Sequence, residues 1–245
     1  KIKNILINSL KNKKIIVTGC AGFIGSNLVD ELLKFNNSIV GIDNLSTGQK
    51  KFNRKALINK KFKFVKCDLT NLKYTKKIIK RADIVFHFAA NADVRCGPDH
   101  TYKDLEQNTI VTYNVLEAMK KNNIENIVFC STGSVYGEPK KFPTPENDTF
   151  PIQTSFYGAS KLAGESLIQA YCEAFNFNSW IFRFVSILGN RYTHGHVYDF
   201  VKQLNSNSKK LKVLGNGLQK KSYLHVDDCI KAITTAIHKS NKKIN

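Results

Sequence analysis

Two hydrophobic patterns alternate along the chain. Short runs rich in β-branched residues predict buried strands, and longer stretches with apolar residues three or four positions apart predict helices. The strand-like runs are residues 15–18, 38–42, 61–66, 83–88, 126–131 and 179–185. The helix-like stretches between them are residues 23–35, 71–81, 101–120 and 156–175. This alternation predicts an α/β fold, a doubly wound parallel sheet whose ligands bind at the carboxyl ends of the strands.

The pattern loosens after residue 186. It predicts a helix over residues 197–205, a short strand over 211–214, and a last helix over 226–238 that follows Tyr223-Leu224-His225. We expect a larger domain of residues 1–185, to which residues 224–239 return. Residues 186–223 are expected to form a smaller lobe.

Composition excludes several classes of protein. With 245 residues, 42% of them hydrophobic, the chain can bury a substantial core. No apolar run approaches the roughly 20 residues that span a bilayer, and the N-terminus lacks a signal-peptide pattern, so a cytoplasmic protein without a membrane partner is expected. The net charge of +19 raises nucleic acid as a partner, but the lysines are spread through the chain without an aromatic-basic motif, so none is expected.

The cysteines and histidines favour no metal site. The six cysteines stand alone, without a C-x-x-C pair or a histidine at ligand spacing, and read as reduced packing residues. His87 reads as a packed strand residue. His194 and His196 lie in a predicted loop that either covers a ligand or is solvated.

A glycine turn connects the first predicted strand to the first helix. Gly19 permits a sharp turn, Gly22 lets the backbone approach a pyrophosphate, and Gly25 lets the helix press on the strand. The helix N-terminus then faces an anion with unpaired N–H groups and the positive end of its dipole. The alternative is a glycine turn that only packs.

An acidic residue ends the second predicted strand. Asp43 lies eighteen positions after Gly25, where a carboxylate can accept hydrogen bonds from both hydroxyls of an adenosine ribose. The same carboxylate would repel a 2′-phosphate. The sequence therefore predicts a Rossmann-type site for NAD rather than NADP.

Tyr157 and Lys161 stand four residues apart at the start of a predicted helix and so share one face. A nearby ammonium favours the phenolate and would bring tyrosine into the range of a useful base. An ordinary aromatic–lysine helix pair is the alternative. Thr132, twenty-five residues upstream at a strand end, could supply a hydroxyl to the same substrate oxygen.

Further motifs follow one another in order from residue 15 to residue 238: TGCAGFIGS, DNLSTG, CDLT, HFAANADVR, the helix with Asn108, STGSVYGEP, YGASK, RFVSILG and GNGLQKKSYLHVDD. In this series the chain resembles the extended short-chain dehydrogenase/reductases. Within them it resembles the NAD-dependent sugar-nucleotide epimerases of the UDP-glucose 4-epimerase type. The resemblance implies transient oxidation at C4 of the sugar to a 4-keto intermediate, and return of the hydride to the opposite face.

The resemblance also implies which residues act. The cofactor-binding residues would be Gly19, Gly22, Phe23, Ile24, Gly25, Asp43, Asn44, Leu45, Ser46, Thr47, Gly48, Asp68, Leu69, Phe88, Ala89, Ala90, Ala92, Asn108, Tyr157, Lys161 and Val185. The catalytic residues would be Thr132, Tyr157 and Lys161. The substrate would also contact Ser186, His196 and Lys221.

The chain departs from the family pattern at three places. Gly133-Ser134 replaces the Asp-Glu pair of the 4,6-dehydratases, which disfavours dehydration. Val185-Ser186 stands where an asparagine is usual, and Lys221 replaces a phosphate-binding arginine with a point charge. Family members continue well past residue 238, so we expect the substrate lobe to be incomplete at its C-terminus.

Other functions stay open at this point: a dehydratase or reductase of the same family, or a non-catalytic NAD-binding protein. A nucleotide-sugar is the expected small-molecule partner, a UDP-sugar above all. The resemblance implies a homodimer in which helices 101–120 and 156–175 pair with their copies. Asp93 and Arg95 either touch the sugar or pair with each other.

Overall fold

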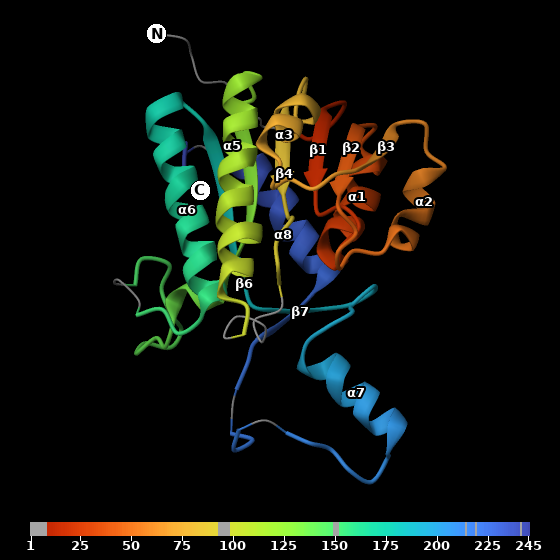
Figure 1. Cartoon of the computed structure of the whole chain (residues 1–245), viewed down its shortest axis with the longest axis vertical. Helices are drawn as coiled ribbons and strands as arrows, with labels where there is room; N and C mark the ends of the chain where they lie inside the picture. Colours follow the sequence, from red (N-terminus) through yellow and green to blue (C-terminus); the bar gives the residue numbers. More distant parts are fainter. Residues whose placement is uncertain (1–8, 93–98, 149–151, 214, 219, 241) are drawn as a thin grey trace.

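The computed structural model describes residues 9–92, 99–148, 152–213, 215–218, 220–240 and 242–245 (Figure 1). Its centre is a six-stranded sheet in the order β3-β2-β1-β4-β5-β6, and every pairing is parallel. The strands are β1 (Lys14–Thr18), β2 (Ser38–Asp43), β3 (Phe62–Lys66), β4 (Ile84–His87), β5 (Asn126–Thr132) and β6 (Asn178–Phe184). The chain reverses its direction of winding between β1 and β4, which makes the crevice there the expected ligand site.

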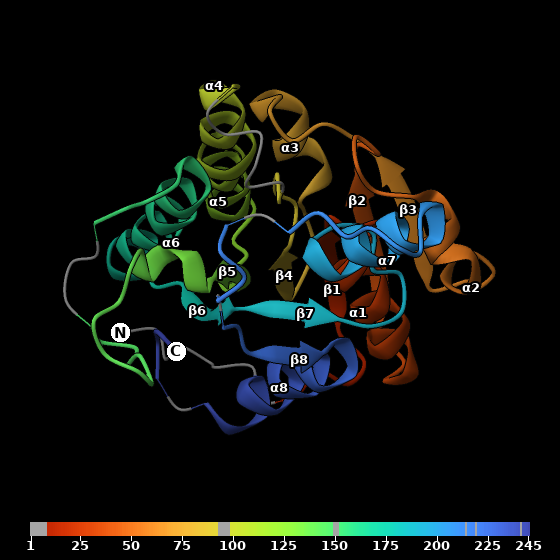
Figure 2. The same ribbon diagram turned by 90° about the horizontal axis from the view of Figure 1, so that it is seen from below.

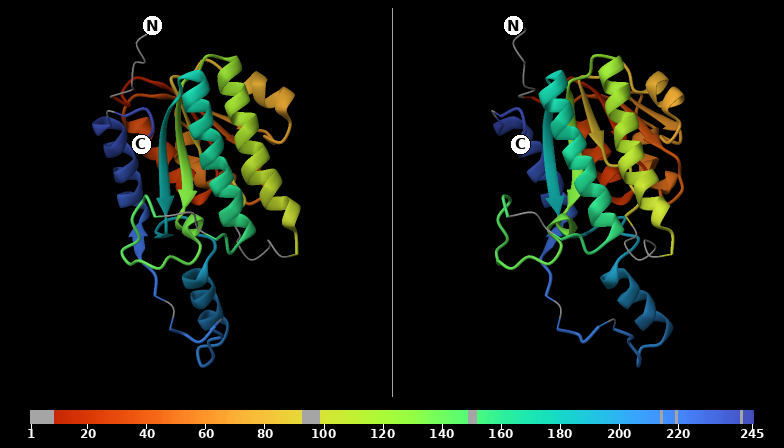
Figure 3. Two further views of the ribbon diagram at one scale, coloured as in Figure 1. Left: turned by 90° about the vertical axis from the view of Figure 1, so that its left-hand side faces the viewer. Right: turned by 60° about the vertical axis from the view of Figure 1, so that its left-hand side comes forward.

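Helices cover both faces of the sheet (Figures 1 and 3). On one face α1 (Phe23–Lys34) packs against α8 (Val226–Lys239). On the other face α5 (Val111–Lys121) packs against both α3 (Leu72–Ile78) and α6 (Phe156–Phe175). The doubly wound parallel sheet predicted from the sequence is confirmed.

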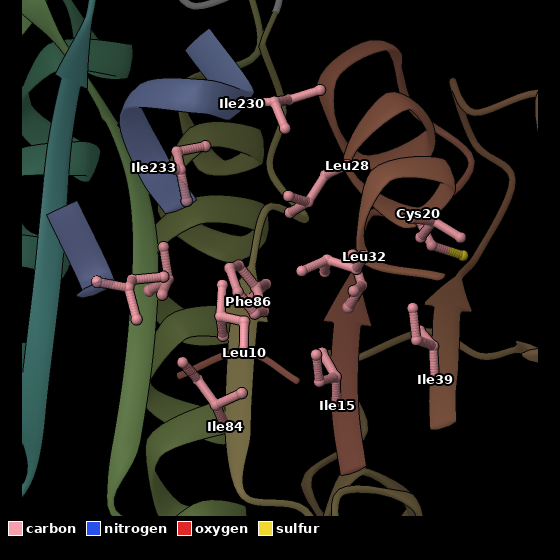
Figure 4. Close-up of a cluster of buried hydrophobic side chains, with 14 of the residues drawn as sticks. Leu10, Ile15, Cys20, Leu28, Leu32, Ile39, Ile84, Phe86, Ile230 and Ile233 are labelled. Atoms are coloured by element: carbon pink, nitrogen blue, oxygen red, sulfur yellow. The ribbon is translucent and has the colours of Figure 1, made fainter. Parts of the chain in front are cut away.

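Alternate residues of the strands supply two separate cores. Ile15 and Phe86 face α1 and α8, where they join Leu28 and Ile233 in one buried cluster (Figure 4). Their strand neighbours Ile16 and Val85 belong to the second cluster, under the helices of the opposite face. Because successive strand residues point to opposite faces, each strand of this sheet is apolar on both sides.

The helix predicted over residues 101–120 contains an irregular turn. It consists of α4 (Thr101–Asp104), a π-helical turn η3 (Leu105–Ile110) and α5. The N–H of Val111 donates to the carbonyl of Glu106, five residues earlier, and the Thr112 hydroxyl donates to the carbonyl of Asn108 at 2.5 Å. Such turns are frequent at functional sites.

A smaller lobe lies beyond the carboxyl ends of the strands (Figures 1 and 2). It contains β7 (Ser186–Leu188), which pairs in parallel with β8 (Tyr223–His225), and the helix α7 (His196–Ser206). The sequence pattern missed β7 and three short helices: η1 (Lys50–Asn53), α2 (Arg54–Leu57) and η4 (Gly133–Tyr136).

The strand predicted over residues 211–214 is wrong for the residues described. Leu211 and Val213 are 39% and 45% exposed, and neither belongs to a strand. The N–H of Lys212 donates to the Gln203 side chain rather than to a neighbouring strand. An apolar run forms a strand only where another strand lies alongside it. Residue 214 lies outside the described residues.

The last helix returns to the larger part of the molecule, since Val226, Ile230 and Ile233 of α8 share the core cluster of α1. Ile244 forms a parallel bridge to Ser179, alongside β6. The division into domains at residues 185 and 223 stays a prediction. In the part of the chain that the structure describes, no helix has the length and apolar character to cross a membrane.

Candidate functional site

The predicted site residues gather at the carboxyl edge of the sheet. Because all six strands are parallel, their carboxyl ends lie at one edge, which faces α7 and β7 in Figure 3. Six stretches reach this edge from strand ends or the loops just after them, with Gly19, Asp43, Asp68, Ala89, Thr132 and Val185.

The glycine turn is tightly packed. Gly19 has a φ of +70°, and a Cβ there would lie 2.7 Å from the backbone of Phe88 and Ala89. A Cβ on Gly25 would lie 2.2 Å from the carbonyl oxygen of Gly19. Only glycine fits at either position, so any other residue type there would force the turn between β1 and α1 to change its shape.

The N-terminus of α1 is open to an anion. Gly22 is its N-cap and has no side chain to bond the first N–H groups of the helix. The N–H groups of Phe23, Ile24 and Gly25 therefore keep their capacity to donate, at the positive end of the helix dipole. Negatively charged phosphates suit this position.

Asp43 lies beside the glycine turn. Its carboxylate accepts from the N–H of Ala21 at 2.9 Å and from that of Leu45 at 2.8 Å, one bond to each oxygen. A Cβ on Gly48 would lie 2.7 Å from the same carboxylate, so the loop folds closely over it. Burial raises the pKa of Asp43, although both backbone bonds oppose the shift. Each oxygen retains a lone pair for a ribose hydroxyl.

A hydrogen bond joins the loops after β2 and β3, where the sequence predicts the adenosine. Asn44 donates to Asp68 at 3.2 Å, and the N–H of Ser46 bonds back to Asn44. Burial would raise the pKa of Asp68, but bonds from Thr70 and Asn44 together lower it. Leu69 is buried, and its carbonyl accepts from the amide of Asn114, which the sequence analysis missed.

These features fit a dinucleotide. Glycines leave room at the first turn, the uncapped helix start suits a pyrophosphate, and a carboxylate with free lone pairs stands at the end of β2. Phe88, Ala89 and Ala90 are half-buried beside this turn, whereas Ala92 is exposed.

Tyr157, Lys161 and Thr132 come together at the start of α6. Ser155 caps this helix by accepting from the N–H of Gly158 at 3.0 Å. Thr132, which ends β5, donates its hydroxyl to Ser134 at 3.2 Å and lies close enough to Tyr157 to lower the pKa of the phenol. Lys161 is 2% exposed, and its Nζ lies 4.1 Å from the centre of the Phe129 ring. The sequence pattern therefore identified groups that the fold does bring together.

The expected lowering of the pKa of Tyr157 is not what the structure gives. Burial raises this pKa most, the negative charge of Asp104 and, where its thiol is ionised, that of Cys130 add to it, and the Thr132 hydrogen bond lowers it only in part. Burial also lowers the pKa of Lys161 to about 8. The four-residue spacing puts both residues on one helix, but it carries no information about burial, which is the largest influence on the pKa of each group.

Asn108 lies on the π-helical turn, 1% exposed. Its side-chain oxygen accepts from the N–H of Asn91 at 2.7 Å, and its amide donates to the hydroxyl of Ser160 at 2.9 Å. Ser160 in turn donates to the carbonyl of Tyr157 at 2.9 Å. The predicted supporting residue is thus connected to the first turn of α6.

His87 is buried and hydrogen-bonded, as its interpretation as a packed residue requires. Because Thr112 gives its proton to the carbonyl of Asn108, its oxygen accepts from Nε2 of His87 at 3.0 Å. Nδ1 then accepts from the Thr18 hydroxyl at 2.8 Å. Burial, and next the charge of Lys161, lower the pKa of His87 to about 3, which keeps the ring neutral.

The sequence analysis missed an ion pair next to the site, between buried Glu165 and half-buried Arg183. Glu165 is one helical turn beyond Lys161 and 1% exposed, and Arg183 of β6 donates to both of its oxygens, at 3.0 and 2.7 Å. Arg183 also bonds Tyr136 and the carbonyl of Glu146. The four-residue spacing from Tyr157 through Lys161 to Glu165 could have identified this carboxylate.

The predicted substrate residues lie on the smaller lobe and are more open. Ser186 begins β7, and Val185 before it is 55% exposed. His196 begins α7 and bonds the hydroxyl of Tyr223 through Nε2. Lys221 is exposed, as is His194, and the structure brings neither against Tyr157.

Asp93 and Arg95 lie outside the described residues. Within the described ranges no three His, Cys, Asp or Glu side chains form a metal site.

Comparison with known proteins identifies the family of the chain. Residues 15–245 match the NAD dependent epimerase/dehydratase family. The UDP-glucose 4-epimerase of Mycolicibacterium smegmatis is 32% identical over 229 residues, covering 91% of this chain and 72% of that protein.

Solved structures agree. A crystal structure of a UDP-galactose 4-epimerase is 35% identical with a TM-score of 0.84, and covers 94% of this chain and 75% of its own. The UDP-glucuronic acid 4-epimerase of Bacillus cereus, solved with UDP-glucuronic acid and NAD, is 32% identical with a TM-score of 0.85, covering 94% and 74%. The sequence prediction of an NAD-dependent sugar-nucleotide epimerase with a Rossmann fold is confirmed. The chain belongs to the NAD-dependent epimerase/dehydratase family.

Proposed function

We propose that this protein interconverts the C4 epimers of a UDP-sugar, with NAD⁺ as a cofactor that stays bound and is regenerated. The observation that carries the proposal is that buried Thr132 and Lys161 and half-buried Tyr157 lie together at the edge of the sheet that also holds the glycine turn and Asp43. The similar epimerases named for UDP-glucose, UDP-galactose and UDP-glucuronic acid support the nucleotide.

In the proposed reaction Tyr157, as the phenolate, accepts the proton of the C4 hydroxyl. Thr132 donates its single hydroxyl proton to the phenolate before the transfer and to the sugar oxygen as negative charge develops there, which keeps the two oxygens aligned. When bound, NAD⁺ supplies the hydride acceptor and a positive charge. After the 4-keto sugar has turned, Tyr157 returns the proton to the C4 oxygen as the hydride comes back to the other face.

Lys161 has two proposed tasks. Its pKa of about 8 means that it is mostly protonated at neutral pH but can exchange its proton within the working range. As an ammonium it favours the phenolate of Tyr157 and donates to the ribose next to the reacting ring. Asn108 supports this site through Ser160.

On the cofactor side, Gly19, Gly22 and Gly25 are proposed to hold the pyrophosphate and Asp43 the adenosine ribose. The remaining cofactor contacts are proposed for Phe23, Ile24, Asn44, Leu45, Ser46, Thr47, Gly48, Asp68, Leu69, Phe88, Ala89, Ala90, Ala92 and Val185. On the substrate side, Ser186, His196 and Lys221 are proposed to face the sugar and the diphosphate.

The test uses the purified protein with NAD⁺ and, in separate assays, UDP-glucose, UDP-galactose and their N-acetyl forms. We expect one pair to interconvert without a change of mass. Tyr157→Phe should lower the rate at least about 100-fold, because it removes the acid–base group. Tyr74→Phe, an exposed tyrosine on α3, is the matched control and should leave the rate unchanged.

Other outcomes identify other functions. A product lighter by one water indicates a dehydratase, and net reduction of a keto sugar indicates a reductase. No conversion of any nucleotide-sugar, together with tight NAD⁺ binding and a Tyr157→Phe variant that behaves as wild type, indicates a binding protein and contradicts the proposal.

A homodimer is proposed as the assembled form. The continuous helix over residues 101–121 and α6 lie side by side on one face, and no other described segment crosses in front of them in Figure 3. Large apolar side chains on these helices are 40–61% exposed: Tyr102, Leu105, Tyr113, Phe156 and Phe175. Pairing with a second copy would bury them.

The proposed location is the cytoplasm. The five described cysteines are all free thiols, as expected in a reducing compartment. Separation of cytoplasmic from membrane and secreted fractions, followed by an epimerase assay, tests this location.

A further inference from the structure

Asp104, at the end of α4, is a carboxylate only 1% exposed to solvent. Its Oδ1 accepts from the amide of Asn91 at 2.8 Å and, at 3.4 Å, from the amide of Asn108. Its Oδ2 has no hydrogen-bond partner among the residues that the structure describes. Neither neighbouring side chain carries a charge to balance it.

Asp104 is connected to the reacting end of α6 by a short chain of contacts. Oδ1 of Asp104 accepts from the side-chain amide of Asn108 and so orients it. In this orientation the NH₂ group also donates to Ser160, and the amide oxygen accepts from the N–H of Asn91. Ser160 then bonds the carbonyl of Tyr157. Asn91, Asn108 and Ser160 are each at most 6% exposed, so solvent cannot replace these bonds.

We propose that Asp104 is a positioning residue for Tyr157: it fixes Asn108, and through Ser160 the first turn of α6, while holding a negative charge beside the site. The inference rests on the proposed epimerase function. Geometry alone does not require the charge, because an asparagine could accept the same two bonds through its oxygen. Among the described residues no cationic side chain pairs with Asp104, and a buried carboxylate without such a partner has an electrostatic effect that an amide would lack.

The groups acting on Tyr157 give the direction of that effect. Burial raises the pKa of Tyr157 most, the negative charges of ionised Cys130 on β5 and of Asp104 on α4 add to it, and Thr132 opposes them. Burial raises the pKa of Cys130 as well, so its thiol is neutral at working pH. Lys161 is the cation on the same helix, and Arg183 of β6 neutralises Glu165. Asp104 therefore favours the protonated form of Tyr157.

The experiment compares Asp104→Asn, which keeps the acceptor and removes the charge, with Asp104→Leu, which removes both. Glu106→Gln is the control, because Glu106 is a half-buried carboxylate two residues further along that accepts a hydrogen bond from its neighbour Gln107. Three quantities are measured. They are the pH dependence of kcat/KM on the UDP-sugar that the wild type converts, KM itself, and hydrogen–deuterium exchange of the helix over residues 101–121 and of α6.

Asp104→Asn should lower the pKa of Tyr157, so the rise of kcat/KM on the acidic side of its pH profile should move to lower pH by about one unit. KM and hydrogen–deuterium exchange should stay near the wild-type values. Glu106→Gln should shift nothing. Asp104→Leu should speed exchange over residues 105–112 and 157–162. A profile of Asp104→Asn that coincides with that of Glu106→Gln, or wild-type exchange in Asp104→Leu, overturns the inference. An inactive wild type contradicts the proposed function instead, and the exchange result still decides whether Asp104 fixes α6.

Discussion

At the scale of single residues, the site is a set of ionisable groups held away from water. Lys161 and His87 are 2% and 0% exposed, and burial lowers the pKa of both, to about 8 and about 3. Tyr157 is shifted upward for the same reason. Each of these groups thus favours its neutral form, and the positive charge of Lys161 is present at neutral pH at a cost in stability.

That cost predicts the behaviour of Lys161→Met. Above pH 8 the folded protein releases the Lys161 proton while the unfolded chain keeps it until about pH 10.5, so wild-type stability rises across this window and the full cost applies below it. Lys161→Met should therefore be more stable than wild type at pH 7, by up to about 3 kcal/mol, and the difference should shrink as the pH rises from 8 to 10.5. Its epimerase activity should fall at least about 100-fold.

Denaturant unfolding at pH 7 and pH 10 measures this difference. Lys103→Met, which removes an exposed lysine on α4, is the control and should change stability little at either pH. A Lys161→Met variant less stable than wild type at pH 7, with a gap independent of pH, would mean that the ammonium is stabilised by its surroundings rather than penalised.

Sequence patterns identified the residues whose types are dictated by the backbone or by local spacing. Gly19 and Gly25 are such residues, and so are Tyr157 and Lys161, one helical turn apart. The patterns missed Asp104 and Arg183, because their roles depend on contacts with segments distant in the sequence. They also could not predict whether the pKa of Tyr157 is raised or lowered, because that shift depends mainly on burial.

At the scale of elements, the positions of the long helices and of the six strands of the main sheet were predictable, whereas β7, the short helices and the π-helical turn were not. The helix over residues 156–175 matches α6, and six strands occur where β-branched runs predicted them. The π-helical turn at Asn108 has no hydrophobic signature, since it is defined by the backbone bond from Val111 to Glu106 and by the bond from the Thr112 hydroxyl to the Asn108 carbonyl. The wrongly predicted strand at residues 211–214 shows the opposite case, an apolar run without a partner strand.

The proposed dimer leads to a prediction at this scale. Tyr113 is 41% exposed on α5, within the face proposed to pair with a second copy. Tyr113→Glu places a charge that pairing would have to bury, so its mass in light scattering should fall from a dimer to a monomer. Ile58→Glu, at a position 86% exposed beyond α2, should keep the wild-type mass. A monomeric wild type, or a dimeric Tyr113→Glu, would rule out this interface.

At the scale of the whole molecule, the parallel sheet explains why residues scattered over the chain act together. Stretches as far apart as Gly19 and Thr132 meet because every strand presents its carboxyl end to the same edge. The smaller lobe lies beyond this edge, and the chain spans about three quarters of the length of the relatives it matches. The fold class followed from strand and helix alternation, whereas the strand order came only from the structure.

The central claim is that Tyr157 and bound NAD⁺ carry out an oxidation and its reversal on one sugar carbon. The most direct measurement uses a UDP-sugar with deuterium at C4 and follows both epimers by NMR and mass spectrometry. The account predicts inverted product with the deuterium still at C4 and no change of mass, in the wild type and not in Tyr157→Phe. Loss of the deuterium to solvent during inversion, or equal inversion by Tyr157→Phe, would contradict it.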